Sequence, residues 1–188
     1  MKQKLVILGG GESGVGTAIL AQQKGFDVFV SDYGAIKDTY AQVLSSNQIN
    51  WEDKGHTVSE IIAADIVVKS PGIADVAPIV CSLKQAGVKV ISEIEFAAQF
   101  TDATIVAITG SNGKTSTASL TYALLKDDLN VALGGNIGDS FAAQVAAPGY
   151  ENFVLELSSF QLDGIEKFAP HIAVLTNLSP DHLDRYEN

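Results

Sequence analysis

The chain has 188 residues, of which 46% are hydrophobic and 18% charged, and its 22 acidic and 12 basic residues give a net charge of -10. This composition is typical of a globular protein, and it excludes disorder, a collagen and a coiled coil. Because nucleic acids and anionic membrane surfaces bind clustered cations, and the basic residues here are scattered, we expect neither as a partner.

The sequence also predicts a cellular compartment. No run of about 18 apolar residues is present, and the segment after Met1–Lys4 has only four apolar residues before Gly9, too few for a signal peptide. The single cysteine, Cys81, cannot form an internal disulfide, and we interpret it as core filler. We therefore expect a cytoplasmic protein, and the sequence indicates no protein partner.

Short runs rich in Val and Ile alternate with segments of helical period, which indicates βαβ units and the α/β fold class. The runs are apolar throughout, as expected for parallel strands covered by helices on both faces. The predicted strands are 4–8, 26–31, 65–69, 88–91, 104–109, 130–133, 153–157 and 171–176. The predicted helices are 14–24, 74–86, 92–100 and 114–127, and Gly25 and Gly87 follow two of them at the position that favours a positive φ.

A first glycine loop, residues 9–14, follows the first predicted strand and has the pattern G-x-G-x-x-G, with Asp32 after the next strand. Glycines let the backbone approach a pyrophosphate, the next helix offers free N–H groups, and Asp32 can bind a ribose or a base. The pattern predicts a pyrophosphate site without specifying NAD. A tight turn with no ligand is the alternative. We expect the Glu12 carboxylate to point away from a diphosphate, which would repel it.

A break in the apolar pattern at residues 99–103 separates the two glycine loops. We therefore predict two domains: a Rossmann-like parallel-sheet domain at residues 1–100, and a P-loop-type α/β domain at residues 101–188. The second has only about 88 residues and ends without an obvious closing strand or helix, so we expect it to be truncated.

The second glycine loop, residues 109–116, reads T-G-S-N-G-K-T-S between a strand and a helix. It departs from the strict G-x-x-x-x-G-K-[ST] pattern because Ile108 occupies the first glycine position. Small residues for an anion nest, Lys114 for terminal phosphates and the Thr115 hydroxyl for magnesium nevertheless remain. A solvated lysine is the alternative interpretation.

Three further candidates lie at or after the ends of buried strands. Glu156 ends one apolar run, and Asp181 and His182 come shortly after the next. A buried carboxylate costs several kcal/mol unless a cation or donors compensate it, so a nearby magnesium ion would explain Glu156, and His182 could bind the same ion. A Glu that caps a helix and a solvated His are the alternatives.

Together these motifs resemble the Mur ligases of peptidoglycan synthesis over the whole chain. The segments that carry the resemblance are the two glycine loops and residues 70–73, 93–95, 134–138, 156–162 and 181–186. T-G-x-N-G-K is typical of the wider ligase family, whereas E-L-S-S-F-Q-L and the short first domain indicate the members that add D-glutamate.

The resemblance implies that the first domain binds the UDP part of UDP-N-acetylmuramoyl-L-alanine, and that the second binds ATP and Mg²⁺. The implied UDP-substrate residues are Ser13, Gly14, Val15, Asp32, Tyr33, Gly72 and Asn136. The implied ATP residues are Gly110, Ser111, Asn112, Gly113, Lys114, Thr115 and Ser116, and the implied metal ligands are Thr115, Glu156 and His182.

The implied reaction is ATP-dependent amide ligation. ATP phosphorylates the L-alanine carboxylate, and the amino group of D-glutamate attacks the acyl phosphate. Lys114 and His182 are the implied catalytic residues. The family's carbamylated lysine and its third domain have no counterpart in this sequence, so we expect this chain to bind UDP compounds without turnover. A non-catalytic nucleotide-binding module, and an NAD-dependent oxidoreductase suggested by the first loop alone, remain as alternatives.

Overall fold

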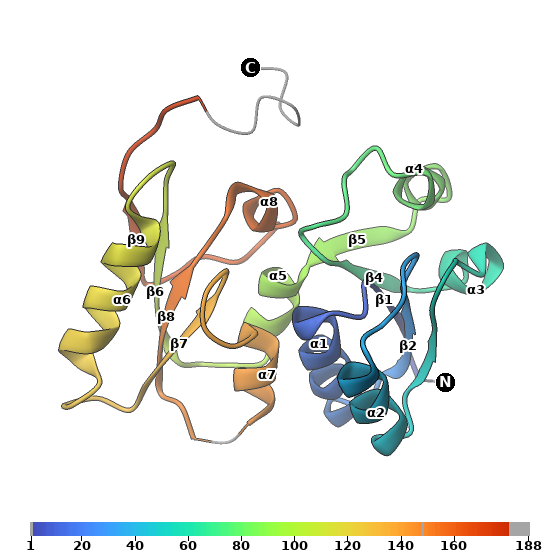
Figure 1. Ribbon diagram of the computed structural model, residues 1–188, viewed down its shortest axis with the longest axis horizontal. Helices are drawn as coiled ribbons and strands as arrows, with labels where there is room; N and C mark the ends of the chain where they lie inside the picture. Colours follow the sequence, from blue (N-terminus) through green and yellow to red (C-terminus); the bar gives the residue numbers. More distant parts are fainter. Residues whose placement is uncertain (1, 148, 181–188) are drawn as a thin grey trace.

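The computed structural model describes residues 2–147 and 149–180, which form two parallel β-sheets with helices between them and outside them (Figure 1). The first sheet has the strand order β3-β2-β1-β4-β5, and the second has the order β7-β8-β6-β9. Every strand pairing is parallel. The predicted α/β class is therefore confirmed. Within the described ranges, no helix is long and apolar enough to cross a bilayer.

The elements follow one another in βα alternation along both units. The first unit contains β1 (Lys4–Leu8), α1 (Glu12–Gln23), β2 (Asp27–Ser31), α2 (Asp38–Ser46), β3 (Asn50–Glu52), α3 (Val58–Ile62), β4 (Ile66–Lys69), α4 (Pro78–Gln85), β5 (Lys89–Ser92) and α5 (Glu93–Ala98). The second contains β6 (Thr104–Thr109), α6 (Lys114–Leu125), β7 (Val131–Gly135), α7 (Phe141–Ala146), β8 (Asn152–Glu156), α8 (Ser159–Leu162) and β9 (Ile172–Leu175). The break between the units at residue 101 stays a prediction.

All eight predicted strands and all four predicted helices are present, with ends shifted by up to four residues. Gly25 and Gly87 have φ angles of +88° and +69°, as expected after a helix. Five short elements were not predicted from the sequence: β3, α2, α3, α7 and α8. Cys81 is half-buried on α4 and outside the buried clusters, so its interpretation as core filler is wrong.

Each glycine loop follows a central strand. β1 lies between β2 and β4, and β6 lies between β8 and β9. The chain leaves β1 toward β2 and β3 on one side and later fills β4 and β5 on the other side. Such a reversal of strand order opens a crevice at the carboxyl ends of the strands, where α/β proteins bind ligands.

Helices α1, α5 and α7 form a shared layer between the two sheets (Figure 1). One continuous apolar cluster includes side chains from both sheets and from these three helices, among them Ile7, Leu20, Phe96, Phe141 and Phe153. Helix α1 approaches α7 closely at Gly16, where an added Cβ would lie 2.5 Å from Ser140 Oγ and 2.9 Å from Ala143 Cβ. The two units are therefore joined by a packed core.

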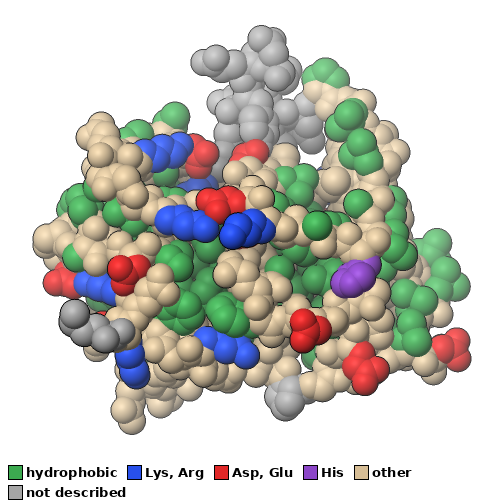
Figure 2. Space-filling view, turned by 180° about the vertical axis from the view of Figure 1, so that it is seen from behind, with side chains coloured by type: hydrophobic (Ala, Val, Ile, Leu, Met, Phe, Trp, Pro, Cys, Tyr) green, Lys and Arg blue, Asp and Glu red, His purple; other side chains and the backbone are tan. Residues whose placement is uncertain are grey.

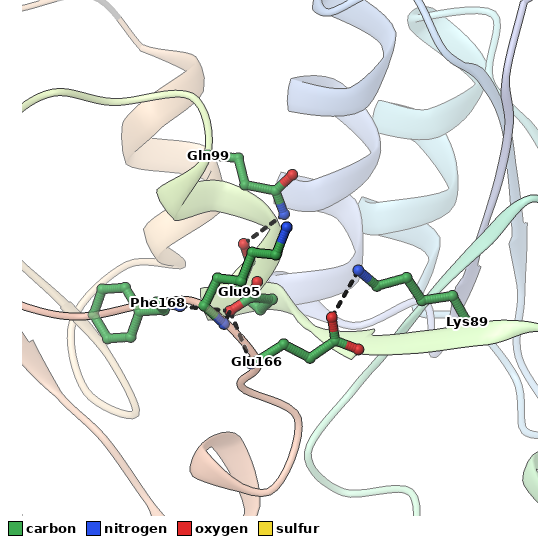
Figure 3. Close-up of polar contacts among 6 residues, drawn as sticks. Lys89, Glu95, Gln99, Glu166 and Phe168 are labelled. Atoms are coloured by element: carbon green, nitrogen blue, oxygen red, sulfur yellow. Dashed lines mark hydrogen bonds and ion pairs between the residues drawn. The ribbon is translucent and has the colours of Figure 1, made fainter.

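A second link between the units is polar (Figure 3). Glu95 Oε2 on α5 accepts hydrogen bonds from the backbone N–H groups of Glu166, Lys167 and Phe168, at 3.0, 3.0 and 2.8 Å. Lys89 forms an ion pair with Glu166 at 2.7 Å. Burial works to raise the pKa of Glu95, but the three amides outweigh it and lower that pKa. The face in Figure 2 shows acidic and basic side chains interspersed on its left half and only acidic ones at its lower right.

Candidate functional site

The first glycine loop presents free backbone donors. Helix α1 begins at Glu12, and its N-cap, Gly11, forms no side-chain cap, so the first N–H groups of the helix lack intrahelical acceptors. A Cβ on Gly14 would overlap the carbonyl oxygen of Gly9, so the loop and the helix pass each other too closely for any side chain. This arrangement suits an anion at the helix N-terminus.

Two acidic side chains border this loop. Asp32 Oδ2 accepts a hydrogen bond from Gly10 N at 2.7 Å, and its Oδ1 accepts one from Gly34 N at 2.8 Å. Asp32 therefore holds the loop in place and keeps its remaining lone pairs for a ligand. Glu12 is turned toward the second unit, where its Oε1 accepts a hydrogen bond from Ser140 N at 3.3 Å.

A cavity of about 840 Å³ opens beside the first loop. It is lined by Gly9, Gly11, Asp32, Tyr33, His56, Val58, Ser70, Ile73, Ala74, Ala77, Pro78, Ile79 and Ser82. Polar groups therefore come from the ends of β1, β2, β3 and β4, and helix α4 with the segment before it supplies an apolar wall. A cavity of this size, apolar with a few convergent polar groups, is typical of a site for a nucleotide-sized ligand.

The predicted UDP-substrate residues lie around this cavity to different extents. Asp32 and Tyr33 line it, and Gly72 lies between Ser70 and Ile73, which also line it. Of the α1 residues, Ser13 is half-buried, whereas Gly14 and Val15 are buried. Ser13 and Gly14 can donate their backbone N–H groups to a ligand, whereas the N–H of Val15 donates to Gly11 O at 2.9 Å. None of the three residues lines the cavity. Asn136 lies on the second unit, beside Glu156.

His56, which lines the cavity, was not predicted from the sequence. Its Nδ1 lies 2.7 Å from Ser31 Oγ, which in turn lies 2.6 Å from Glu52 Oε1. Burial works to raise the pKa of Glu52, but hydrogen bonds from Ser31 and Thr57 outweigh it and lower that pKa. His56 follows a three-residue strand that was not predicted, so no motif placed it near the first loop.

The second glycine loop also leads into a helix, α6, whose first backbone N–H groups have no side-chain cap. Gly110 and Gly113 have φ angles of +133° and +83°, and Gly113 caps α6 without a side-chain hydrogen bond. Lys114 Nζ donates to Gly110 O at 2.8 Å and to Ser111 O at 3.1 Å. An ammonium group has three donors, so one of them is left for a phosphate oxygen.

The other predicted ATP residues are arranged around that lysine. Asn112, Gly113, Thr115 and Ser116 are exposed, and Ser111 is half-buried. Ser111 N donates to Asn177 O at 3.0 Å, which ties the loop to the segment after β9. The structure thus brings the predicted residues 110–116 together at the start of α6.

Glu156 supplies a test of the magnesium hypothesis. Its side chain is only 1% exposed, its Oε1 accepts a hydrogen bond from Asn136 Nδ2 at 2.8 Å, and its Oε2 has no partner among the described residues. Glu156 pairs in register with Ile108, which directly precedes the second loop. A buried carboxylate oxygen without a donor fits a cation beside this loop.

The rest of the predicted metal site is only partly covered by the structure. The hydroxyl of Thr115 lies on the first turn of α6, and His182 lies outside the described residues. Within residues 2–147 and 149–180, no group of three or more His, Cys, Asp or Glu side chains could hold a metal ion. The donor set present, a carboxylate and a hydroxyl, is of the kind that magnesium prefers.

Glu93 is a second buried carboxylate, at the contact between the units. Its Oε1 accepts hydrogen bonds from Ser140 Oγ at 2.6 Å and from Ala142 N at 2.9 Å, and its Oε2 has no partner among the described residues. Burial raises the pKa of Glu93; the two donors oppose that rise, and the nearby Glu12 adds to it. This carboxyl group therefore favours its neutral form.

Two family models match the chain: the MurD N-terminal domain matches residues 4–79, and the Mur ligase middle domain matches residues 108–188. Among curated proteins, the UDP-N-acetylmuramoylalanine–D-glutamate ligase of Christiangramia forsetii is 60% identical over 188 residues. That of Bacteroides thetaiotaomicron is 56% identical over 187 residues. These alignments cover 100% and 99% of this chain but 42% of each relative, so the chain spans less than half of their length.

Solved structures support the same fold. A UDP-N-acetylmuramate:L-alanyl-gamma-D-glutamyl-meso-diaminopimelate ligase from Neisseria meningitidis superposes with a TM-score of 0.63 at 23% identity, covering 99% of this chain and 64% of that one. A UDP-N-acetylmuramate-alanine ligase from Thermotoga maritima has a TM-score of 0.59 at 22% identity, covering 98% of this chain and 44% of that one.

Proposed function

Because this chain belongs to the Mur ligase family, we propose that it is the N-terminal part of a ligase that adds D-glutamate to UDP-N-acetylmuramoyl-L-alanine in peptidoglycan synthesis. Its share of the activity is to bind two anionic nucleotides. The observation that carries this proposal is the pair of glycine loops, each at the carboxyl end of a central strand and each followed by a helix with free N–H groups.

Residues 1–100 bind the UDP substrate. The start of α1, at Ser13, Gly14 and Val15, faces the diphosphate; the N–H groups of Ser13 and Gly14 bind it, while that of Val15 donates to Gly11 O at 2.9 Å. The 840 Å³ cavity takes the nucleoside. Asp32 and Tyr33 contact the ribose or the base, Gly72 lies beside the same cavity, and Asn136 contacts the substrate from the second unit. Binding here positions the L-alanine carboxylate toward the second loop.

Residues 101–188 bind ATP. The backbone of residues 110–116 surrounds the phosphates, and the remaining donor of Lys114 binds the oxygens of the terminal phosphates. Thr115, Glu156 and His182 would hold Mg²⁺, which when bound supplies positive charge against the phosphate oxygens. His182 lies outside the described residues, so its part rests on the family resemblance alone.

The chemistry needs charge and position rather than a protein nucleophile. The first step brings a carboxylate against the γ-phosphate of ATP, and both reactants are anions. Lys114 reduces their repulsion, while the packed layer of α1, α5 and α7 keeps the two loops at a fixed separation. Transfer of the γ-phosphoryl group releases ADP and gives an acyl phosphate. The amino group of D-glutamate then attacks the acyl carbon, which forms the amide and releases phosphate. The cytoplasmic location stays a prediction.

Calorimetric titration of this chain with UDP-N-acetylmuramoyl-L-alanine, with MgATP and with NADH tests the proposal. We expect saturable binding of the UDP compound and none of NADH. Binding of NADH without binding of the UDP compound would instead favour an oxidoreductase. If only the uridine part of the UDP compound contributes to its affinity, a non-catalytic nucleotide-binding module is favoured.

A further inference from the structure

Ser31, Glu52 and His56 form a hydrogen-bonded chain at one end of the first cavity. Ser31 is fully buried at the end of β2, and its Oγ lies 2.6 Å from Glu52 Oε1 and 2.7 Å from His56 Nδ1. Glu52 also accepts hydrogen bonds from Thr57, with its N at 2.7 Å and its Oγ1 at 2.5 Å. The imidazole of His56 lines the cavity.

The positions of the hydrogens follow from this geometry. Glu52 accepts three hydrogen bonds, and these donors lower its pKa against the opposing effect of burial, so it is an ionised acceptor. The single hydrogen of the Ser31 hydroxyl must then point to Glu52, because two oxygens at 2.6 Å would otherwise face each other with lone pairs. Ser31 Oγ therefore accepts from His56, and Nδ1 of His56 carries a hydrogen.

The other ring nitrogen of neutral His56 is consequently an acceptor. A neutral imidazole has one N–H, and here that N–H is Nδ1. Nε2 has no hydrogen-bond partner among the described residues, and its ring faces the cavity. In this tautomer, which the hydrogen bond to the buried Ser31 selects, the site offers a ligand an acceptor nitrogen.

The strand order places this acceptor at the nucleoside end of the site. The first glycine loop follows β1, Asp32 follows β2, and His56 follows β3, the outermost strand on this side. Neighbouring strands lie about 4.8 Å apart, so β3 is roughly 10 Å from β1. A nucleotide with its diphosphate on the first loop would extend its ribose past β2 and its base toward β3.

We propose that His56 selects the base of the bound nucleotide, with Nε2 accepting a hydrogen bond from the ring N–H of uracil. This inference rests on the proposed function, since it assumes that a nucleoside diphosphate occupies the cavity. The ring nitrogen N3 of uracil carries a hydrogen, whereas N3 of cytosine carries a lone pair that would face the lone pair of Nε2. The fixed tautomer therefore favours uridine over cytidine nucleotides.

Titration of the unmodified chain with UDP, CDP and N3-methyl-UDP tests the proposal without a variant that could fail to fold. We expect UDP to bind about tenfold more tightly than N3-methyl-UDP, because the methyl group removes one hydrogen-bond donor and leaves Nε2 of His56 unpaired against the ligand. CDP should bind more weakly than UDP as well. Equal affinities for UDP and N3-methyl-UDP would overturn the inference.

The variant His56→Asn sharpens the test. The Asn amide N–H can replace Nδ1–H toward Ser31, but it provides no acceptor at the position of Nε2. We expect it to lose about tenfold in UDP affinity and to bind UDP and N3-methyl-UDP equally. The matched control is His171→Asn, because His171 lies on the second unit, where its Nδ1 accepts a hydrogen bond from Ile105 N at 3.2 Å. It should keep the full preference for UDP.

Nitrogen-15 NMR of the imidazole rings supplies an independent readout. At a pH where the histidines are neutral, His56 should be the Nδ1–H tautomer and His171 the Nε2–H tautomer, since their Nδ1 atoms have opposite hydrogen-bond roles. An Nε2–H tautomer at His56 would overturn the inference. If the unmodified chain does not bind UDP at all, both the proposed function and this inference are wrong. If it binds UDP and N3-methyl-UDP equally well, only this inference is wrong.

Discussion

The two glycine loops share one order of elements but differ in what holds them. Asp32 accepts a hydrogen bond from the backbone of the first loop, and this loop borders a formed cavity. The second loop is tied to the segment after β9 and to its own lysine, because Lys114 Nζ donates to Gly110 O and Ser111 O. The first site is therefore preorganised by neighbouring strands, whereas ligand binding at the second must compete with contacts inside the loop.

The largest expected effect separates the two loops by function. In the full-length ligase, Lys114→Ala should reduce acyl-phosphate formation by about 10³-fold, because a cation aimed at the transferred phosphoryl group is lost. The affinity for the UDP substrate should stay nearly unchanged. Rapid-quench measurement of phosphate transfer, with calorimetry for the UDP substrate, checks both. Equal losses at both sites would contradict the difference between the loops.

The next effect concerns the close packing of the first loop. Gly14→Ala places a Cβ onto the carbonyl oxygen of Gly9, so we expect a loss of about 3 kcal/mol in the free energy of unfolding. Gly11→Ala is the matched control, because a Cβ there meets no atom within 4 Å. Gly11→Ala should leave the free energy of unfolding unchanged and weaken only UDP binding, since Gly11 lines the cavity. Urea unfolding and UDP titration of both variants measure these outcomes.

A third effect tests the cation site of the second loop. If MgATP binds the native chain, it should stabilise it by about 2.7 kcal/mol at a ligand concentration 100-fold above Kd. Glu156→Gln replaces a carboxylate whose Oε2 is buried without a partner among the described residues. Most of the magnesium-dependent part of the stabilisation by ATP should therefore disappear. Thermal unfolding with ATP, with and without magnesium, gives the difference. An unchanged magnesium effect would remove Glu156 from the site.

The smallest expected effect concerns Glu93 at the contact between the two units, where a change in stability should leave the first loop unaffected. Burial raises the pKa of Glu93 above its ordinary value of 4.5, so its stabilising contribution is fully present below pH 4.5 and is lost as the pH rises through the raised pKa. Glu93→Gln stays neutral and should flatten that part of the stability profile. Urea unfolding from pH 4.5 upward measures it. UDP affinity should not change, because Glu93 does not line the cavity.

The sequence predicted the parts of both sites that depend on a strand, a glycine loop and a helix in succession. The two loops lie at the ends of β1 and β6 because apolar runs and glycine spacing determine them locally. His56 could not be found in this way, because its role depends on pairing between β2 and a three-residue β3 far along the chain. Residues 93–95 stood out only through the family resemblance, and the burial of Glu93 and Glu95 between the units was not predicted, since no local pattern shows which acidic side chains become buried across two units.

Gly16 has a consequence for how the distance between the two glycine loops is set. Because Gly16 has no side chain, the backbone of α1 packs directly against Ser140 and Ala143 of the other unit. Any larger residue would push α1, which begins at the first glycine loop, away from α7, which follows residues 134–138. A single methyl group at this position should therefore change the distance between the two glycine loops while leaving every residue of the loops intact.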